Sequence, residues 1–135
     1  MEQKLEHSQE GLLEKQLEQM EEALDREDIA EIDELYERMH PIDLAEAMEE
    51  WDEEQLEQFC HLADDEKLAE LLTEADEELQ VELAKFLSNS RLLTIFSHMQ
   101  KDDIVDMLGN LRINRRKQLV DLMRAGDRKV ITELL

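Results

Sequence analysis

The chain has 135 residues and a formal net charge of −22, a length that fits one domain and a field that excludes nucleic acids and anionic membrane surfaces as partners. With 3 Gly, 1 Pro and many helix-forming residues, the composition predicts an all-α protein. No apolar run approaches the roughly 20 residues of a membrane span, and the single cysteine excludes a disulfide framework, so we expect a soluble cytoplasmic chain.

Residues 2–24 form the first predicted helix, because leucine and methionine recur there at helical spacing. Four of its apolar residues also fit a short coiled-coil seam: Leu13, Leu17, Met20 and Leu24. Two heptads do not establish such a seam. A break near residues 25–28 separates this acidic N-terminal helix, assigned to residues 1–27, from a second helix at residues 29–39. The second helix begins the other predicted part of the chain, residues 28–135.

From His40 to the C-terminus the sequence divides into eight consecutive blocks of twelve residues. The eighth residue of every block is apolar: Ala47, Phe59, Leu71, Leu83, Ile95, Met107, Leu119 and Ile131. The twelfth is apolar as well: Trp51, Ala63, Ala75, Leu87, Met99, Leu111, Met123 and Leu135. A fixed period indicates a repeat architecture, and twelve residues hold one helix of about two turns plus a tight connector. We therefore predict about six to eight short helices in this part of the chain.

Within the blocks, apolar residues favour positions 5, 8, 9 and 12, which form the stripe of an amphipathic helix. Position 1 of four successive blocks carries a good N-cap residue: Asp52, Asp64, Asp76 and Ser88. Each helix should therefore run from about position 2 to position 11 of its block. Helices this short do not persist alone and must stack into a superhelix. The expected core includes Leu44, Phe59, Leu68, Leu71, Leu83, Ile95, Ile104, Leu108 and Leu119. Blocks seven and eight carry Arg116 and Arg128 at position 5, as expected of atypical terminal repeats.

Charge is unevenly distributed along the chain. Residues 1–87 contain 31 acidic residues against 6 Lys and Arg, whereas residues 88–135 contain 6 against 9. The acidic part attracts cations or a basic partner. A simpler interpretation remains open, because acid-rich helices often present only a solvated face.

No catalytic constellation is present in the sequence, so we expect no enzymatic activity. The serines lack a nucleophile-elbow context, and there is no glycine-rich phosphate loop. The four histidines never form the i, i+4 pair that a zinc site favours: His7, His40, His61 and His98. Trp51 and the methionines of the apolar stripes are expected in the core.

Carboxylates are the remaining candidates for chemistry. Position 7 faces away from the apolar stripe and is acidic in four blocks: Glu46, Glu70, Glu82 and Asp106. Asp102 and Asp106 lie i, i+4 on one face of a predicted helix, with Asp103 beside them. Mg²⁺ accepts one or two such carboxylates when water or a second protein surface fills its other positions.

The run HPIDLAEAMEEWDEEQLEQF, followed by DDEKLAELL and QKDDIVDMLGNL, resembles the cytosolic N-terminal domain of the MgtE family of magnesium channels and transporters. The resemblance covers about residues 28–135. It implies a right-handed superhelix of short helices, in a protein that continues with paired CBS domains, a plug helix and a transmembrane channel. It also implies a homodimer in the cell membrane, with this domain on the cytoplasmic side and without direct membrane contact.

Family members hold regulatory Mg²⁺ ions between acidic residues of this domain and acids of the CBS region. Aligning block with block carries three such positions onto Glu70, Asp102 and Asp106, with Asp103 as a further candidate. The implied function is a Mg²⁺-sensing domain that gates the channel. One alternative stays open, because similar repeats occur in the flagellar motor switch protein FliG and in stand-alone regulatory proteins. Those are protein–protein scaffolds with no ion to sense, and the acidic N-terminal helix would then be a docking segment.

Overall fold

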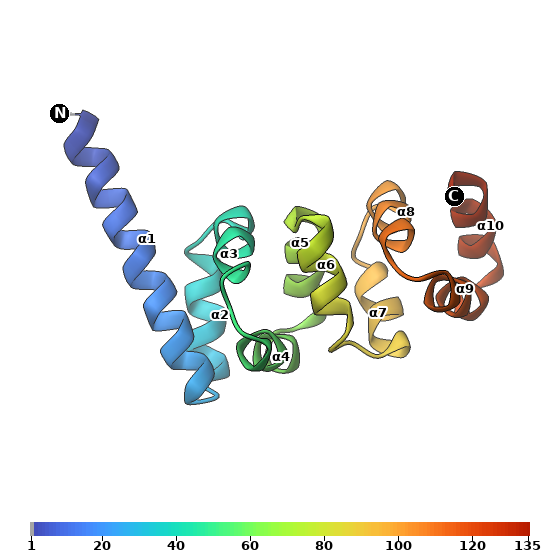
Figure 1. The fold of residues 1–135 in the computed structure, drawn as a ribbon, viewed down its shortest axis with the longest axis horizontal. Coiled ribbons are helices and arrows are strands. Elements are labelled where there is room, and N and C mark those ends of the chain that lie inside the picture. The colour runs from blue at the N-terminus through green and yellow to red at the C-terminus, as the bar shows by residue number, and fades with distance from the viewer. Residues whose placement is uncertain (1) are drawn as a thin grey trace. The chain divides into compact units, whose positions relative to one another are not determined.

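The computed structural model describes residues 2–135, with side chains from residue 11 onward, and this part of the chain is all α-helical with no strand. Its ten helices follow one another through short connectors (Figure 1). They are α1 (Glu2–Asp25), α2 (Ile29–Glu37), α3 (Pro41–Met48), α4 (Glu53–Leu62), α5 (Asp65–Glu74), α6 (Glu77–Ala84), α7 (Asn89–Phe96), α8 (Lys101–Asn110), α9 (Ile113–Leu122) and α10 (Ala125–Leu134). The predicted all-α class and the two leading helices are confirmed.

Every helix from α3 to α10 begins at the second residue of its twelve-residue block, as predicted. Helix ends are less uniform, because α3, α6 and α7 stop two residues before the predicted position 11. In these three the chain continues as a tighter turn with bonds to the carbonyl three residues back, as from Leu87 N–H to Ala84 O at 3.2 Å. Helix α5 instead ends at Ala75 in an extended conformation, with its N–H donating to Leu71 O at 2.9 Å.

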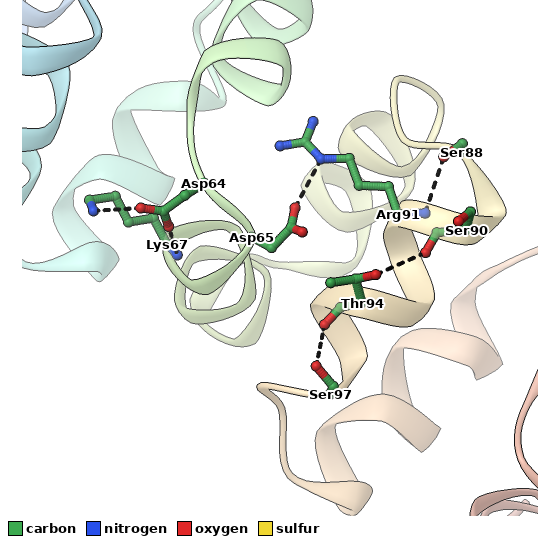
Figure 2. Close-up of polar contacts among 8 residues, drawn as sticks. All are labelled: Asp64, Asp65, Lys67, Ser88, Ser90, Arg91, Thr94 and Ser97. Atoms are coloured by element: carbon green, nitrogen blue, oxygen red, sulfur yellow. Dashed lines mark hydrogen bonds and ion pairs between the residues drawn. The ribbon is translucent and has the colours of Figure 1, made fainter.

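All four predicted N-caps are confirmed. The side chains of Asp52, Asp64, Asp76 and Ser88 each accept a hydrogen bond from the backbone N–H three residues later. Figure 2 shows Asp64 and Ser88 at the starts of α5 and α7. His40 precedes Pro41, which occupies the first helical turn of α3, where its missing N–H is no loss. N-caps satisfy donors that a helix start leaves unpaired, so they help to fix where these four helices begin.

The break between α1 and α2 is a Schellman motif. Asp28 N–H donates to Ala23 O at 3.0 Å, and Glu27 N–H donates to Leu24 O at 3.1 Å. Glu27 adopts a φ of 54°, a left-handed conformation that usually favours glycine. Asp28 then caps α2 by accepting from Glu31 N–H at 3.2 Å. The predicted break therefore combines the end of one helix with the cap of the next.

The chain forms two compact units, one ending at Ala63 and the other beginning at Asp64. The first contains α1 to α4, and its α1 packs on α2 and α4 through its last turns. Met20, Ala23 and Leu24 are buried there, whereas Leu12 is 56% exposed. Trp51, half-buried, lies edge-on to Phe59 with 6.0 Å between ring centroids. The predicted boundary between residues 27 and 28 separates the N-terminal helix from the repeats and not these two compact units, and it stays a prediction.

In the second unit each helix packs on the helix two positions further along the chain. The contacting pairs are α5 with α7, α6 with α8, α7 with α9 and α8 with α10, and α10 also contacts α9. Apolar position 8 supplies the continuous core, with Leu71, Leu83 and Ile95 among its fully buried residues. All nine predicted core residues are confirmed, each at most 2% exposed. The handedness of a superhelix stays a prediction.

Gln80 is a buried polar residue that sequence reasoning did not single out. It occupies position 5, where three neighbouring blocks place Leu68, Leu92 and Ile104. Its amide donates to Leu72 O at 2.8 Å and accepts from Asn110 at 2.9 Å. Both ends of the amide are therefore satisfied, which removes most of the cost of burying it.

Candidate functional site

Three carboxylates on α8 form the candidate site that the sequence predicted on one helix. Asp102 and Asp106 are exposed and lie one turn apart, and Asp103 is half-buried between them in sequence. Within the described part of the chain, none of these three side chains makes a hydrogen bond or an ion pair. Asp102 and Asp103 lie in the first helical turn, where the helix dipole favours negative charge. Asp106 lies beyond that turn and has no such support.

Several other acids of the same unit do have cationic partners. Asp65 accepts from Arg91 at 2.9 Å, as Figure 2 shows, and Glu82 pairs with Lys85 at 2.7 Å. Asp64 caps α5 and also binds the ammonium of Lys67 at 2.9 Å. Burial alone would raise the pKa of Asp64, but hydrogen bonds and the charge of Lys67 outweigh it and lower the pKa. The acids on α8 are thus electrostatically unlike these neighbours.

A register rule connects alternate helices of this unit. Three side-chain contacts join position 2 of one block to position 4 of the block two further on, always 26 residues apart. They are Asp65–Arg91 at 2.9 Å, Asn89–Arg115 at 3.1 Å and Lys101–Asp127 at 3.0 Å. The same register on α6 and α8 matches Glu77 with Asp103, and neither makes a polar contact within the described residues. Two carboxylates therefore occupy positions that elsewhere hold complementary groups.

Glu70, the third predicted ligand, lies exposed on α5 and already takes part in an interaction with another residue. Helix α5 packs on α7, whereas α8 packs on α6 and α10. Among the described residues, no group of three or more His, Cys, Asp or Glu is arranged to hold a metal ion. Glu70 and the acids of α8 therefore do not make a complete site together in this chain. A metal ion held there would need further ligands from water or another surface.

Arg115, on α9, is a residue that sequence reasoning missed. Its guanidinium donates to the carbonyls of Ala84 and Leu87 at the end of α6, and to the Asn89 side chain at the start of α7. Burial lowers the pKa of Arg115, because the charged form loses hydration. Its carbonyl partners lie in the last turn of α6 and beyond it, where a helix leaves acceptors unpaired. Its spacing of 26 residues from Asn89 was the sequence signal from which this contact could have been predicted.

A cavity of about 440 Å³ lies in the C-terminal part of the second unit. Side chains from α7, α8 and α10 and from the end of α9 line it: Leu93, Thr94, Phe96, Ser97, Lys101, Ile104, Leu122, Met123, Arg124, Asp127 and Ile131. Position 5 of block eight is Arg128, whose guanidinium donates to the carbonyls of Asp121 and Met123. Blocks five and six place buried Leu92 and Ile104 at that position. Because arginine occupies position 5, α10 contributes no apolar side chain to the cavity lining at that position, although Ile131 at position 8 does line the cavity.

Comparisons with known proteins agree on one kind of domain. The family model of the MgtE intracellular N domain matches residues 39–135. A solved structure described as the soluble part of a magnesium transporter matches with a TM-score of 0.81 and 21% sequence identity. The match covers 91% of this chain but 49% of that chain, so the present sequence spans about half of its length. No curated protein matches the chain. Separately, none of the described helices combines the length and apolar character that crossing a bilayer requires.

Proposed function

The chain belongs to the family of MgtE intracellular N domains, and from this membership we propose that it is the Mg²⁺-sensing, gating domain of a magnesium transporter. In this proposal it holds Mg²⁺ through Glu70, Asp102 and Asp106, with Asp103 as a further ligand. The remaining ligands come from a CBS domain of the same full-length homodimeric protein, on the cytoplasmic side of the membrane. The domain itself has no enzymatic role.

The observation that carries the proposal is the state of the carboxylates on α8. Asp102 and Asp106 are exposed, one turn apart and without a cationic partner in the described part of the chain. Hard oxygen ligands on a rigid helix suit Mg²⁺, which retains several waters and takes one or two carboxylates from one surface. A second acidic surface facing α8 would share the ion.

Gating then follows from electrostatics. At low Mg²⁺ the acidic face of this domain and an acidic CBS face repel each other, which favours separation. At high Mg²⁺ the ions bridge the two faces and favour the closed arrangement. An ion shifts this equilibrium only by its difference in affinity for the two arrangements. Several bridging ions acting together would therefore give a steep response.

The first experiment is a Mg²⁺ titration of this chain, alone and joined to its downstream region, with amide chemical shifts as the readout. Because half of each ligand set is missing, the chain alone should bind weakly, with a Kd on the order of millimolar. The joined protein should bind more tightly. Asp102→Asn and Asp106→Asn should abolish the gain, whereas Asp121→Asn on α9 serves as the matched control. Sodium at equal ionic strength separates screening of the −22 charge from site binding.

The second experiment measures conduction of the full-length channel. Neutralising Asp102 and Asp106 together should leave the pore conducting at Mg²⁺ concentrations that close the unmodified channel. Closure of the double variant at the unmodified concentration would assign these residues to solvated surface. A Mg²⁺ response that also survives Glu70→Gln would show that the ions act at other residues, whereas an unmodified protein without any Mg²⁺ response would favour the scaffold function instead.

A further inference from the structure

The helices that carry Glu70 and Asp106 pack mainly on other helices of the second unit. Glu70 lies on α5, which packs on α7, whereas Asp106 lies on α8, which packs on α6 and α10. Carboxylates that face one second ligand surface together must keep a fixed spacing, because a binding constellation tolerates only small displacements. The spacing of these two candidate ligands therefore depends on what connects α5 to α8.

Gln80 on α6 makes this connection. It is the one buried amide or charged side chain among the residues that the structure describes. Its amide nitrogen donates to Leu72 O in the last turn of α5 at 2.8 Å, and its amide oxygen accepts from the Asn110 side chain at the end of α8 at 2.9 Å. Leu72 follows Glu70 by two residues. Asn110 lies one turn after Asp106. Two consecutive hydrogen bonds therefore link the two helices that present the carboxylates.

Stability alone does not explain a glutamine at this position. Position 5 of neighbouring blocks carries Leu68, Leu92 and Ile104, each at most 2% exposed, so an apolar side chain fits there. A satisfied amide is tolerated in a core but stabilises it little, because folding exchanges its bonds to water for bonds within the protein. What the amide adds is direction, since a fully satisfied buried polar network favours one arrangement of the elements that it joins.

We propose that Gln80 is a positioning residue for the candidate Mg²⁺ site, an inference that rests on the proposed function. By tying α5 to α8 it sets the spacing at which Glu70 and Asp106 face a second ligand surface. Gln80 does not bind the ion itself, because it is buried and both ends of its amide are occupied. Loss of the bridge leaves both carboxylates present but lets their spacing vary, which weakens binding that needs both of them.

Distances between spin labels test this positioning without Mg²⁺. Labels at Glu70→Cys and Asp106→Cys, in a Cys60→Ala background and in EDTA, report the spacing of the two ligand positions by pulsed electron paramagnetic resonance. The chain with Gln80 should give one narrow distance distribution, and Gln80→Leu should broaden or shift it. Arg115→Met is the matched control, because Arg115 ties α9 to the end of α6 and the start of α7 and does not link α5 to α8. This control should leave the label distance unchanged.

Mg²⁺ titration of the chain joined to its downstream region tests the consequence. Gln80→Leu should weaken the apparent Kd by about threefold to tenfold. Its urea midpoint should stay near that of the unmodified protein, because leucine fits position 5. Asn110→Ala cuts the same bridge at its other end and should reproduce both the weaker Kd and the altered label distance. Arg115→Met should show the opposite pattern, with a lower urea midpoint and an unchanged Kd.

The results for the unmodified joined protein separate the two levels of the proposal. If it shows no Mg²⁺ response, the proposed function fails and the role of Gln80 fails with it. If it responds and both bridge variants respond with the same Kd, the proposed function stands and the positioning role is wrong. An unchanged label distance in Gln80→Leu and Asn110→Ala would also overturn the positioning role. So would an equal loss of affinity in Arg115→Met, which would assign the effect to a general loss of stability.

Discussion

Helices α5–α8 and helices α9–α10 share a start position and a twelve-residue period, but different interactions hold them in place. Helix α5 buries four residues, Leu68, Ala69, Leu71 and Leu72, whereas α9 and α10 each bury one, Leu119 and Ile131. The last two helices rely on arginines instead. Arg115 binds the end of α6, and Arg128 binds carbonyls at the end of α9.

The twelve-residue period and the interactions that hold the helices together therefore vary independently. One buried residue at position 8 is common to all six helices of the unit: Leu71, Leu83, Ile95, Met107, Leu119 and Ile131. Positions 4 and 5 instead vary between apolar contact and polar contact. In the C-terminal blocks, where position 5 is arginine, a cavity of about 440 Å³ lies beside Leu122, which is 59% exposed.

The largest expected difference between the two regions is in core truncation. Leu71→Ala on α5 should lower the free energy of unfolding by about 2–5 kcal/mol, because it removes a fully buried side chain and leaves a void. Leu134→Ala on α10 is the matched control and should change stability by less than about 0.5 kcal/mol, because Leu134 is 48% exposed. Urea denaturation of both variants measures the difference. Equal losses would show that burial of the leucine side chain does not determine its contribution to stability.

Removing the guanidinium of Arg115 should cost less. Arg115→Met keeps most of the aliphatic stem but leaves the carbonyls of Ala84 and Leu87 without this donor, so we expect a loss of about 1–3 kcal/mol. Arg116→Met is the control, since Arg116 has no polar partner among the described residues and occupies the normally apolar position 5. Thermal unfolding followed by circular dichroism compares the two. A larger loss for Arg116→Met would show that arginine is needed at position 5 instead.

Capping distinguishes the two regions as well. Asp64→Ala should cost about 0.5–2 kcal/mol at neutral pH, since Asp64 caps α5. The pKa of Asp64 is lowered in the folded chain, so its contribution is fully present above its ordinary pKa. It is lost as the pH falls below about 4 and through the lowered value. The urea unfolding midpoints of the unmodified chain and of Asp64→Ala should therefore converge as the pH is lowered from neutral to acidic. A constant difference would show that the ionised carboxylate of Asp64 does not provide this stabilisation.

Helix α9 allows the reverse substitution. Its N-cap is Arg112, whose side chain makes no capping hydrogen bond. Arg112→Ser should raise the free energy of unfolding by about 0.5–1 kcal/mol, because serine can accept from an unpaired N–H of the first turn. Arg112→Ala controls for the loss of the positive charge. Equal effects of serine and alanine would assign the change to charge alone.

The smallest expected effect concerns the register shared by α6 and α8. Glu77→Lys would give Asp103 a partner of the kind that Arg91 gives Asp65, and should stabilise the unit by about 0.2–1 kcal/mol. Glu78→Lys makes the same charge change outside the register and is the control. The thermal midpoint of each variant, measured at low salt, distinguishes a specific pair from a general reduction of the net charge of −22.

The repeat and its core were predictable from the sequence to an unusual degree. Four N-caps, eight helix starts and nine core residues followed from the period, because N-caps act within three residues and the apolar stripe is a property of one helix. Helix ends were less predictable, as the early stops of α3, α6 and α7 show. The candidate ligands Asp102 and Asp106 were placed on one helix face by spacing alone, yet their Mg²⁺ role remains a prediction.

By itself the sequence determined the helices, their phase and the residues that face inward, since these depend on spacing along the chain. Only the tertiary structure decided how alternate helices meet. It paired Asp65 with Arg91, gave Gln80 two partners and directed Arg115 to the end of α6. Among the described residues it gave the acids of α8 no Lys or Arg partner, and it opened the cavity near Leu122. Most of these contacts join residues 26 or more positions apart, and the bond from Gln80 to Leu72 connects two successive helices. The cavity depends on unfilled space, and all of these features are set by the packing of whole helices.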